Sequence, residues 1–130
     1  MSLESRHIEA LRKKARRGFN GYPIATVCYY GPDDTSASKV SVGIVLGSDE
    51  EPATLETWFN HQRDVRYDHQ IHEQVLGFVR LHDAKSVVIA PKILGCPHES
   101  PADYPVGESC PQCPFWADRD RWEGVIDRDP

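Results

Sequence analysis

Three of the four cysteines and one histidine lie close together near the carboxyl end of the chain. They form the pair Cys96-Pro97-His98 and, after eleven intervening residues, the turn Cys110-Pro111-Gln112-Cys113. Thiolate and imidazole are the ligands that zinc prefers, and a Cys-x2-Cys turn directs two sulfurs at one ion. Side chains two residues apart in an extended segment leave the same side of the backbone. The pattern therefore predicts one Zn²⁺ bound by Cys96, His98, Cys110 and Cys113.

The same residues allow other interpretations, which the sequence leaves open. Cys110 and Cys113 could form a reversible thiol switch, or the cluster could bind iron. A structural disulfide needs an oxidising compartment, and Met1 to Leu11 contains no apolar segment of a secretory signal. We therefore expect a cytoplasmic protein with reduced thiols. Cys28 lies inside the apolar run Ile24 to Tyr30, where we expect a small buried side chain without a metal role.

Residues 96–113 resemble the metal-binding segment of a zinc ribbon or a zinc knuckle, and no family is recognised for the whole chain. The resemblance implies a structural ion with four protein ligands. Such a site has no open position for water, so it offers no Lewis-acid catalysis.

The segment is also similar in part to the zinc deaminases, which combine a His or Cys ligand, a glutamate two residues later and a Pro-Cys-x2-Cys turn. Here Glu99 follows His98 by one residue, and Ser109 precedes Cys110 where those enzymes have proline. The spacing therefore favours a structural ion. Glu99 is the candidate general base of the alternative, a zinc-dependent hydrolase or deaminase-like enzyme.

The chain has 130 residues and a net charge of −5 that is unevenly distributed. Residues 1–21 carry six basic and two acidic side chains, and the remaining residues carry nine basic and eighteen acidic side chains. The length suits a single domain, in which we expect an α+β core at residues 1–92 and a zinc-binding segment at 93–130 packed on it. That segment is polar and proline-rich, so metal binding would supply the folding free energy that apolar burial cannot. No run of eighteen apolar residues is present, and we expect no membrane span.

Three segments have the composition and periodicity of strands. Tyr22 to Tyr30 is rich in β-branched and aromatic residues, and the turn signal Gly31-Pro32-Asp33-Asp34 follows it. From Lys39 to Leu46, apolar residues alternate with Lys39, Ser41 and Gly43, which indicates a sheet with one buried face. Thr54 to Phe59 is a weaker third strand, with Leu55, Thr57 and Phe59 on one side.

Two helices and a fourth strand complete the expected elements. Ile8, Leu11 and Ala15 recur at helical spacing between Ser2 and about Arg17. A longer helix should begin at Asp64 or Asp68 and end near His82, with an apolar stripe formed by Ile71, Val75, Phe78, Val79 and His82. Lys85 to Ala90 contains three consecutive apolar residues, typical of a strand covered on both faces, and Pro91 should end it.

This order of elements predicts an α+β fold. An N-terminal helix precedes a three-stranded antiparallel meander, a crossover helix, a fourth strand parallel to the first, and an irregular zinc-bound C-terminal segment. A right-handed crossover then gives the strand order 3-2-1-4.

The arrangement is similar to the double-stranded-RNA-binding domain and to the opening of the ribonuclease-H-like fold. The second helix, however, begins near Asp64-Val65-Arg66 rather than with a lysine cluster, and the interior of the first strand has no carboxylate. No functional role is carried over.

Basic side chains crowd the end of the first helix and could bind phosphates; they are Arg12, Lys13, Lys14, Arg16 and Arg17. Cations at a helix carboxyl end also interact favourably with its dipole, and the acidic body would repel a polyanion. Nucleic-acid binding is therefore the second alternative. Our main expectation is a module that binds other proteins or ligands and contains a structural zinc.

The remaining polar candidates have ordinary structural interpretations. His61, His69 and His72 suggest a second metal site, but a surface pair of His69 and His72 with Asp68 and Glu73 is favoured. His82 should cap the helix or hydrogen-bond in the core.

Two further groups of residues lie in the loop after the first strand and near the carboxyl end of the chain. Asp33 and Asp34 should hydrogen-bond their own backbone, with a pocket opposite Arg63 or Arg66 as the alternative. The aromatic residues after the second cysteine pair should seat the turn on the sheet; they are Phe115, Trp116 and Trp122.

Overall fold

The computed structural model describes residues 6–48, 50–98 and 110–116. It contains the helices α1 (Arg6–Arg16) and α2 (His69–Leu81), the strands β1 (Ile24–Tyr30), β2 (Lys39–Val45), β3 (Thr54–Phe59) and β4 (Ser86–Ile93), and two 3₁₀ turns, η2 (Val65–Tyr67) and η3 (Pro114–Trp116). The predicted α+β fold class is confirmed. The first helix was predicted from Ser2, and residues 2–5 lie outside the described part.

The four strands form one sheet in the order β3-β2-β1-β4, as predicted. β1 and β3 both pair antiparallel with β2, and β4 runs parallel to β1. Val27 lies opposite both Val42 of β2 and Ile89 of β4, so successive strands present apolar side chains to the same face.

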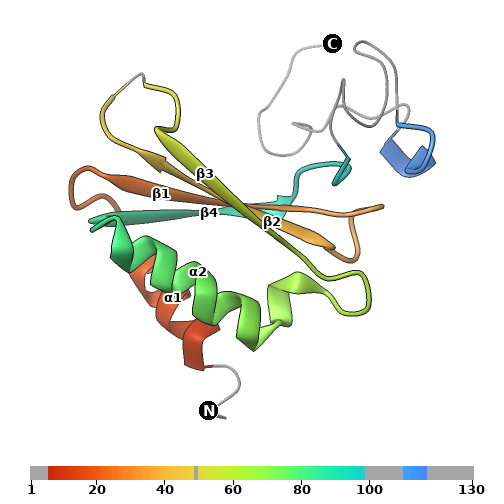
Figure 1. Ribbon diagram of the computed structural model, residues 1–130, viewed down its shortest axis with the longest axis horizontal. Coiled ribbons are helices and arrows are strands. Elements are labelled where there is room, and N and C mark those ends of the chain that lie inside the picture. The colour runs from red at the N-terminus through yellow and green to blue at the C-terminus, as the bar shows by residue number, and fades with distance from the viewer. Residues whose placement is uncertain (1–5, 49, 99–109, 117–130) are drawn as a thin grey trace.

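Both helices lie on one face of this sheet (Figure 1). The core between helices and sheet includes Leu11 of α1, Val27 and Val42 of the sheet, and Val75 and Val79 of α2, all buried. Trp58 of β3 faces the helices as well, and its ring meets that of Phe78 edge to face at 6.0 Å.

The opposite face of the sheet is only partly covered. Val88 of β4 is 54% exposed, so the prediction that this strand is covered on both faces is wrong. A continuous apolar run does not distinguish one covered face from two. Lys39 and Ser41, by contrast, were expected on an open face and are buried. Lys39 is buried under the segment that follows β4, and its ammonium donates to the carbonyl of Pro97 there.

The end of β4 also differs from the prediction. Pro91 was expected to end the strand, yet β4 continues to Ile93, which lies opposite Tyr29 after a shift in register. Proline lacks the N–H that a central strand needs, but β4 is an edge strand with a local irregularity, where proline is tolerated. The extra residues carry the chain to the end of β1 and thereby position Cys96.

Capping side chains set the limits of α2. The carboxylate of Asp68 accepts hydrogen bonds from the backbone N–H groups of Gln70 and Ile71, which have no partner inside the helix. Asp64 caps the short η2 turn in the same way, so each aspartate predicted as a helix start begins a helical element. His82 is the C-cap residue of α2, as predicted.

His72 is buried in the core, and its predicted place on the surface is wrong. The residue is 1% exposed. Its Nδ1 lies 2.9 Å from the carbonyl oxygen of Asp68 and its Nε2 lies 3.0 Å from the hydroxyl of Tyr29. Because a carbonyl only accepts, Nδ1 carries the hydrogen and Nε2 accepts from Tyr29. Burial raises the pKa of Tyr29 to about 12, so its hydroxyl keeps the proton that it donates.

Burial also lowers the pKa of His72. The unfolded chain therefore binds a proton at this residue more readily than the folded chain does. Stability is retained above the ordinary histidine pKa of about 6.5 and is lost as the pH falls below it.

Replacing Tyr29 with phenylalanine should lower the free energy of unfolding by about 1–3 kcal/mol at neutral pH, because Nε2 of His72 would stay buried without a donor. Urea denaturation at pH 7.5 measures the change. Tyr67→Phe is the matched control, since Tyr67 is exposed and its loss of a hydroxyl should be nearly neutral. Equal effects of the two substitutions would contradict the role assigned to the Tyr29 hydroxyl.

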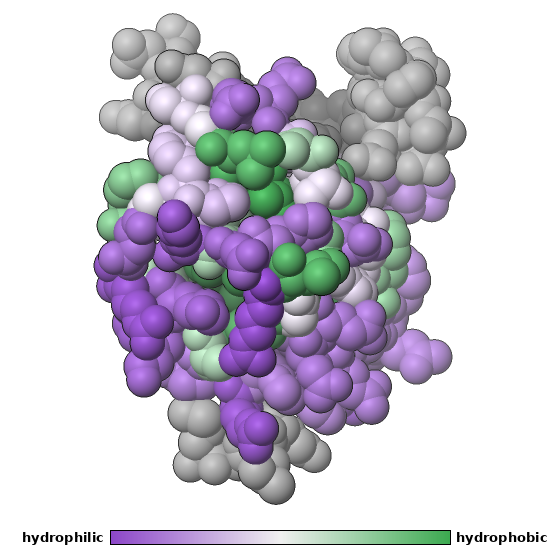
Figure 2. All heavy atoms as spheres, turned by 60° about the vertical axis from the view of Figure 1, so that its left-hand side comes forward, coloured by the Kyte–Doolittle hydropathy of each residue, from purple (hydrophilic) through white to green (hydrophobic). Residues whose placement is uncertain are grey.

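The surface is mainly hydrophilic but carries exposed apolar side chains. Figure 2 shows hydrophobic patches among hydrophilic residues on the side that it presents. Large hydrophobic residues that are more than half exposed include Phe19, Leu46, Leu55 and Val88. Among the described residues, no helix combines the length and apolar character needed to cross a membrane.

Candidate metal centre

The structure brings the four predicted ligand residues together. One ligand atom from each of Cys96, His98, Cys110 and Cys113 lies within 4.8 Å of all the others. The three cysteines are buried, and His98 is partly buried. All four cysteines of the chain are free thiols, so no disulfide competes for these sulfurs. The group could therefore hold a metal ion such as zinc.

The distances identify Nδ1 as the nitrogen that faces the sulfurs. It lies 3.2 Å from Sγ of Cys96 and 3.5 Å from Sγ of both Cys110 and Cys113. Zinc bonds of about 2.3 Å to sulfur and about 2.0 Å to nitrogen, at tetrahedral angles, separate those atoms by about 3.5 Å. The arrangement of His98 thus has the dimensions of a Cys₃His tetrahedron.

The first half of the cluster is positioned by the end of the sheet. Beyond β4, the N–H of Leu94 donates to the carbonyl of Tyr29, and the N–H of Gly31 donates to the carbonyl of Gly95. These bonds continue the pairing between β1 and the chain that follows β4. The backbone N–H of His98 then donates to Sγ of Cys96 at 3.2 Å, which fixes the turn between the two ligand residues.

Lys39 joins this half of the cluster to β2. Its Nζ donates to the carbonyl of Pro97 at 3.2 Å and lies 5.2 Å from the centre of the Tyr30 ring. A buried ammonium group needs such partners, because the loss of its bound water would otherwise destabilise the charged form. This role was not predicted, since the alternation of Lys39 with apolar residues indicated an exposed strand residue.

The second half is a tight turn attached to the loop after β1. The N–H of Cys113 lies 3.3 Å from the carbonyl of Cys110, and the 3₁₀ turn η3 follows directly. Nε1 of Trp116 donates to the carbonyl of Gly31 at 2.8 Å, and its ring packs beside the cysteines. Trp116 therefore seats the turn, as predicted, whereas the predicted partner Trp122 lies outside the described residues.

Gly31 is the residue at which both halves meet. Its N–H binds the segment before Cys96, and its carbonyl binds Trp116 after Cys113. A Cβ atom at this position would lie 2.0 Å from the carbonyl oxygen of Ser36. The sequence indicated Gly31 only as part of a turn signal, because its hydrogen-bond partners Gly95 and Trp116 are more than sixty positions away.

The cysteines lie in surroundings that disfavour an unbalanced negative charge. Burial raises the pKa of Cys96 to about 12, and the N–H of His98 that donates to its sulfur offsets this only in part. Burial likewise raises the pKa of Cys113. Three adjacent thiolates are therefore stable only with a cation between them, because the positive charge of the ion favours the deprotonated form of each sulfur.

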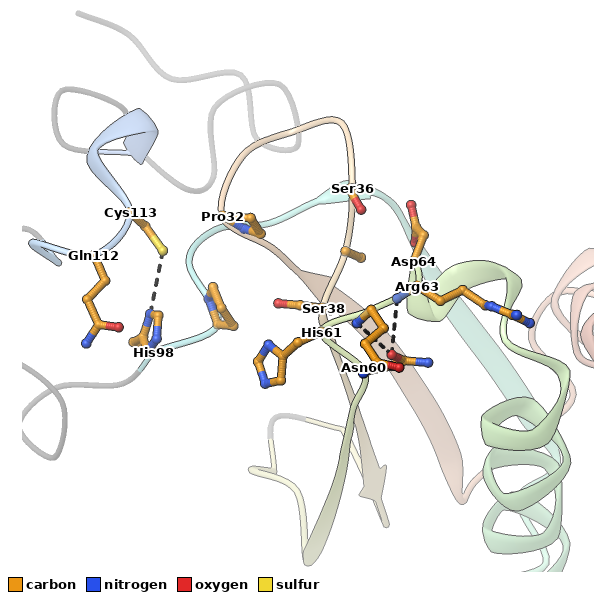
Figure 3. Close-up of a pocket in the computed structure, with 13 residues that line it drawn as sticks. Pro32, Ser36, Ser38, Asn60, His61, Arg63, Asp64, His98, Gln112 and Cys113 are labelled. Atoms are coloured by element: carbon orange, nitrogen blue, oxygen red, sulfur yellow. Dashed lines mark hydrogen bonds between the residues drawn. The ribbon is translucent and has the colours of Figure 1, made fainter.

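A cavity of about 410 Å³ adjoins the cluster (Figure 3). Its walls come from the β1–β2 loop, from residues 60–64 and from the Cys/His segment. Its lining includes Ser38, His61, His98, Gln112 and Cys113. The two remaining cysteines of the cluster, Cys96 and Cys110, are not among its described lining residues.

The other predicted polar candidates fall into separate places. Asp33 accepts hydrogen bonds from the backbone N–H groups of Thr35 and Ser36, as predicted for a turn residue. Arg66 pairs with Asp64 at 2.7 Å rather than with Asp33. His61 lines the cavity, whereas His72 lies in the core. Glu99, the candidate general base, lies outside the described residues.

Comparisons with known protein families, with curated proteins and with solved structures found no match for this chain. The interpretation of the cluster therefore depends on the chemistry of its own side chains.

Proposed function

We propose that Cys96, His98, Cys110 and Cys113 bind one structural Zn²⁺, which fastens the segment after β4 to the loop after β1. The observation that carries this proposal is the convergence of four ligand atoms within 4.8 Å of one another. The Nδ1 to sulfur distances, which match a tetrahedral ion, support it further. Four protein ligands fill a zinc tetrahedron, so no position remains for a reactive water.

The zinc would act as a cross-link between two short segments. Residues 96–98 are attached to the sheet through Lys39 and the pairing with β1, and residues 110–113 are attached through Trp116. Neither segment has an extensive apolar core, so an ion between them supplies the missing folding free energy. The result is a fixed surface around the cavity.

We propose that this surface belongs to a binding or interaction module. The cavity beside the metal centre and the partly uncovered face of the sheet support this function. The basic residues of α1 remain an alternative nucleic-acid contact, although Arg16 is already paired with Glu9 at 2.6 Å. Zinc-dependent hydrolysis through Glu99 has no supporting observation among the described residues.

Substitution of cobalt for zinc should test the closed site. A Co²⁺ ion with three thiolates and one imidazole should give intense visible bands and strong sulfur-to-metal charge transfer, with no change on adding azide or cyanide. Cys28→Ser, a control that removes the cysteine outside the cluster, should leave the spectrum unchanged. A weak spectrum typical of five or six ligands, or one that responds to added anions, would favour the enzyme instead.

A further inference from the structure

We propose that Cys113 is a modification site, at which a small peroxide such as hydrogen peroxide enters through the cavity, oxidises the metal centre and releases its zinc. The inference rests on the proposed function, since it requires zinc-bound thiolates. The cavity would then admit small peroxides, and Cys113 would be the first of the three cysteines to be oxidised.

Access distinguishes Cys113 from the other two cysteines. Cys113 is one of the residues that line the cavity, whereas Cys96 and Cys110 are not among its described lining residues. All three are almost completely buried, with exposed fractions of 2% for Cys113, 3% for Cys96 and 6% for Cys110, so the distinction rests on the cavity and not on overall exposure. A molecule as small as hydrogen peroxide fits easily in a cavity of about 410 Å³ and can reach a sulfur in its wall.

The opposite wall offers polar groups that can hold such a molecule. Ser38 and His61 point into the space that separates them from His98 and Gln112 (Figure 3). The hydroxyl of Ser38 and the amide of Gln112 can each donate and accept a hydrogen bond, as peroxide does. Asp64 in the wall is paired with Arg66. Arg63 also lines the cavity, but its side chain points away from His98 (Figure 3).

The chemistry balances in two steps. The sulfur of Cys113 attacks one peroxide oxygen, so an S–O bond forms, the O–O bond breaks, and hydroxide leaves with the electron pair. The sulfur of Cys96 or Cys110, each within 4.8 Å, then attacks the sulfenic acid, forming an S–S bond and expelling a second hydroxide. Two thiolates are oxidised and one peroxide is reduced, and zinc retains one thiolate and one imidazole.

Loss of two ligands would end the cross-link between residues 96–98 and 110–113. Among the described residues, the turn that contains Trp116 would then lose its metal link and keep the hydrogen bond of Trp116 to Gly31 and the packing of the Trp116 ring on the core. Peroxide would therefore change the surface around the cavity while leaving the core between sheet and helices intact.

The test uses the zinc-loaded full chain with hydrogen peroxide. Zinc release is followed with a chromogenic chelator, and the sulfenic acid is trapped with dimedone and located by mass spectrometry. The first label is expected at Cys113. Cys28 is an internal reference: it is half-buried, burial raises its pKa, and no metal holds it as a thiolate, so it should react later.

Variants that change the size of the cavity test whether the access of peroxide to Cys113 limits the rate of zinc release. His61→Trp should fill part of the cavity and slow zinc release by roughly threefold to tenfold, because access to the thiolate limits the rate. Gln112→Ala should widen the cavity and accelerate release. Tyr67→Trp, at an exposed position outside the cavity, is the control and should leave the rate unchanged. If His61→Trp does not retain zinc, Ser38→Leu replaces it.

Each outcome decides the proposal. First labelling at Cys96, Cys110 or Cys28, or an unchanged rate in a zinc-loaded cavity-filling variant, would overturn this inference and leave the structural zinc standing. A purified chain that binds no zinc would overturn both. First labelling at Cys113 with opposite rate changes in the two cavity variants is the result expected.

Discussion

Replacing Cys113 with serine should remove the metal and free the segment that contains η3, while the core of sheet and helices persists. Zinc at roughly a thousand times its dissociation constant stabilises the state that binds it by about 4 kcal/mol, and this stabilisation should disappear. Hydrogen exchange measures the effect residue by residue. The amides of Cys113 and Trp116, which bond within the turn, should exchange much faster in the variant, and that of Val27 should remain protected.

Cys28→Ser is the matched control for this experiment, because it removes a thiol of β1 that lies outside the cluster. The control should keep one zinc per chain and the protection of Cys113 and Trp116. Unchanged protection of these amides in Cys113→Ser would mean that hydrogen bonds alone hold the turn, and the cross-linking role would be wrong.

Replacing Gly31 with alanine should destabilise the protein by about 3 kcal/mol or more and weaken zinc binding at the same time. The new methyl group would lie 2.0 Å from the backbone oxygen of Ser36, so the loop has to move. Moving Gly31 displaces the N–H that binds Gly95 and the carbonyl that binds Trp116, one on each side of the metal centre. Thermal unfolding and zinc titration of the same samples measure both effects.

Gly77→Ala is the matched control, and it should raise the stability of the protein where Gly31→Ala lowers it. Gly77 lies in α2, and a Cβ there would meet no atom within 4 Å. Alanine should therefore stabilise the protein by about 0.5–1 kcal/mol, because it costs less conformational entropy in a helix. If Gly31→Ala were as harmless as Gly77→Ala, the close approach at Gly31 would not be a feature of the protein in solution.

Local sequence patterns were sufficient to predict the elements. β-Branched residues and alternation located β1, β2 and β3 to within two residues of their observed ends, and the apolar stripe located α2. These signals depend on side chains that are near one another in sequence, so no knowledge of the tertiary structure was needed. The strand order followed from the short connections and the single long crossover.

The errors arose where distant segments decide the environment. His72 occupies the edge of an apolar stripe, and its burial leaves no ring nitrogen unpaired because Nε2 accepts from the hydroxyl of Tyr29 across the core, in addition to the local bond from Nδ1 to Asp68. Lys39 belongs to an alternating strand, and it is buried beside the distant Pro97, whose carbonyl accepts its hydrogen bond, and beside the ring of Tyr30. Pro91 remains within β4 because that strand lies at the edge of the sheet.

For the candidate metal centre, too, local features were predicted and contacts between distant segments were not. The four ligand residues were recognisable from their types and spacing, and their convergence is as expected. Trp116 was predicted to position them, but Gly31, Lys39 and the wall residues 60–64 were not, because they precede the cluster by more than thirty positions in the sequence. Ligand chemistry can thus be predicted from local spacing, whereas access to the site requires the fold.

X-ray absorption at the zinc edge of the purified protein measures the ligands of the metal without any substitution in the chain. One zinc per chain, surrounded by three sulfurs at about 2.3 Å and one nitrogen at about 2.0 Å, is the result that a closed Cys₃His site predicts. A protein purified without zinc, or an ion with an oxygen in place of one of these ligands, would contradict the structural site proposed for Cys96, His98, Cys110 and Cys113.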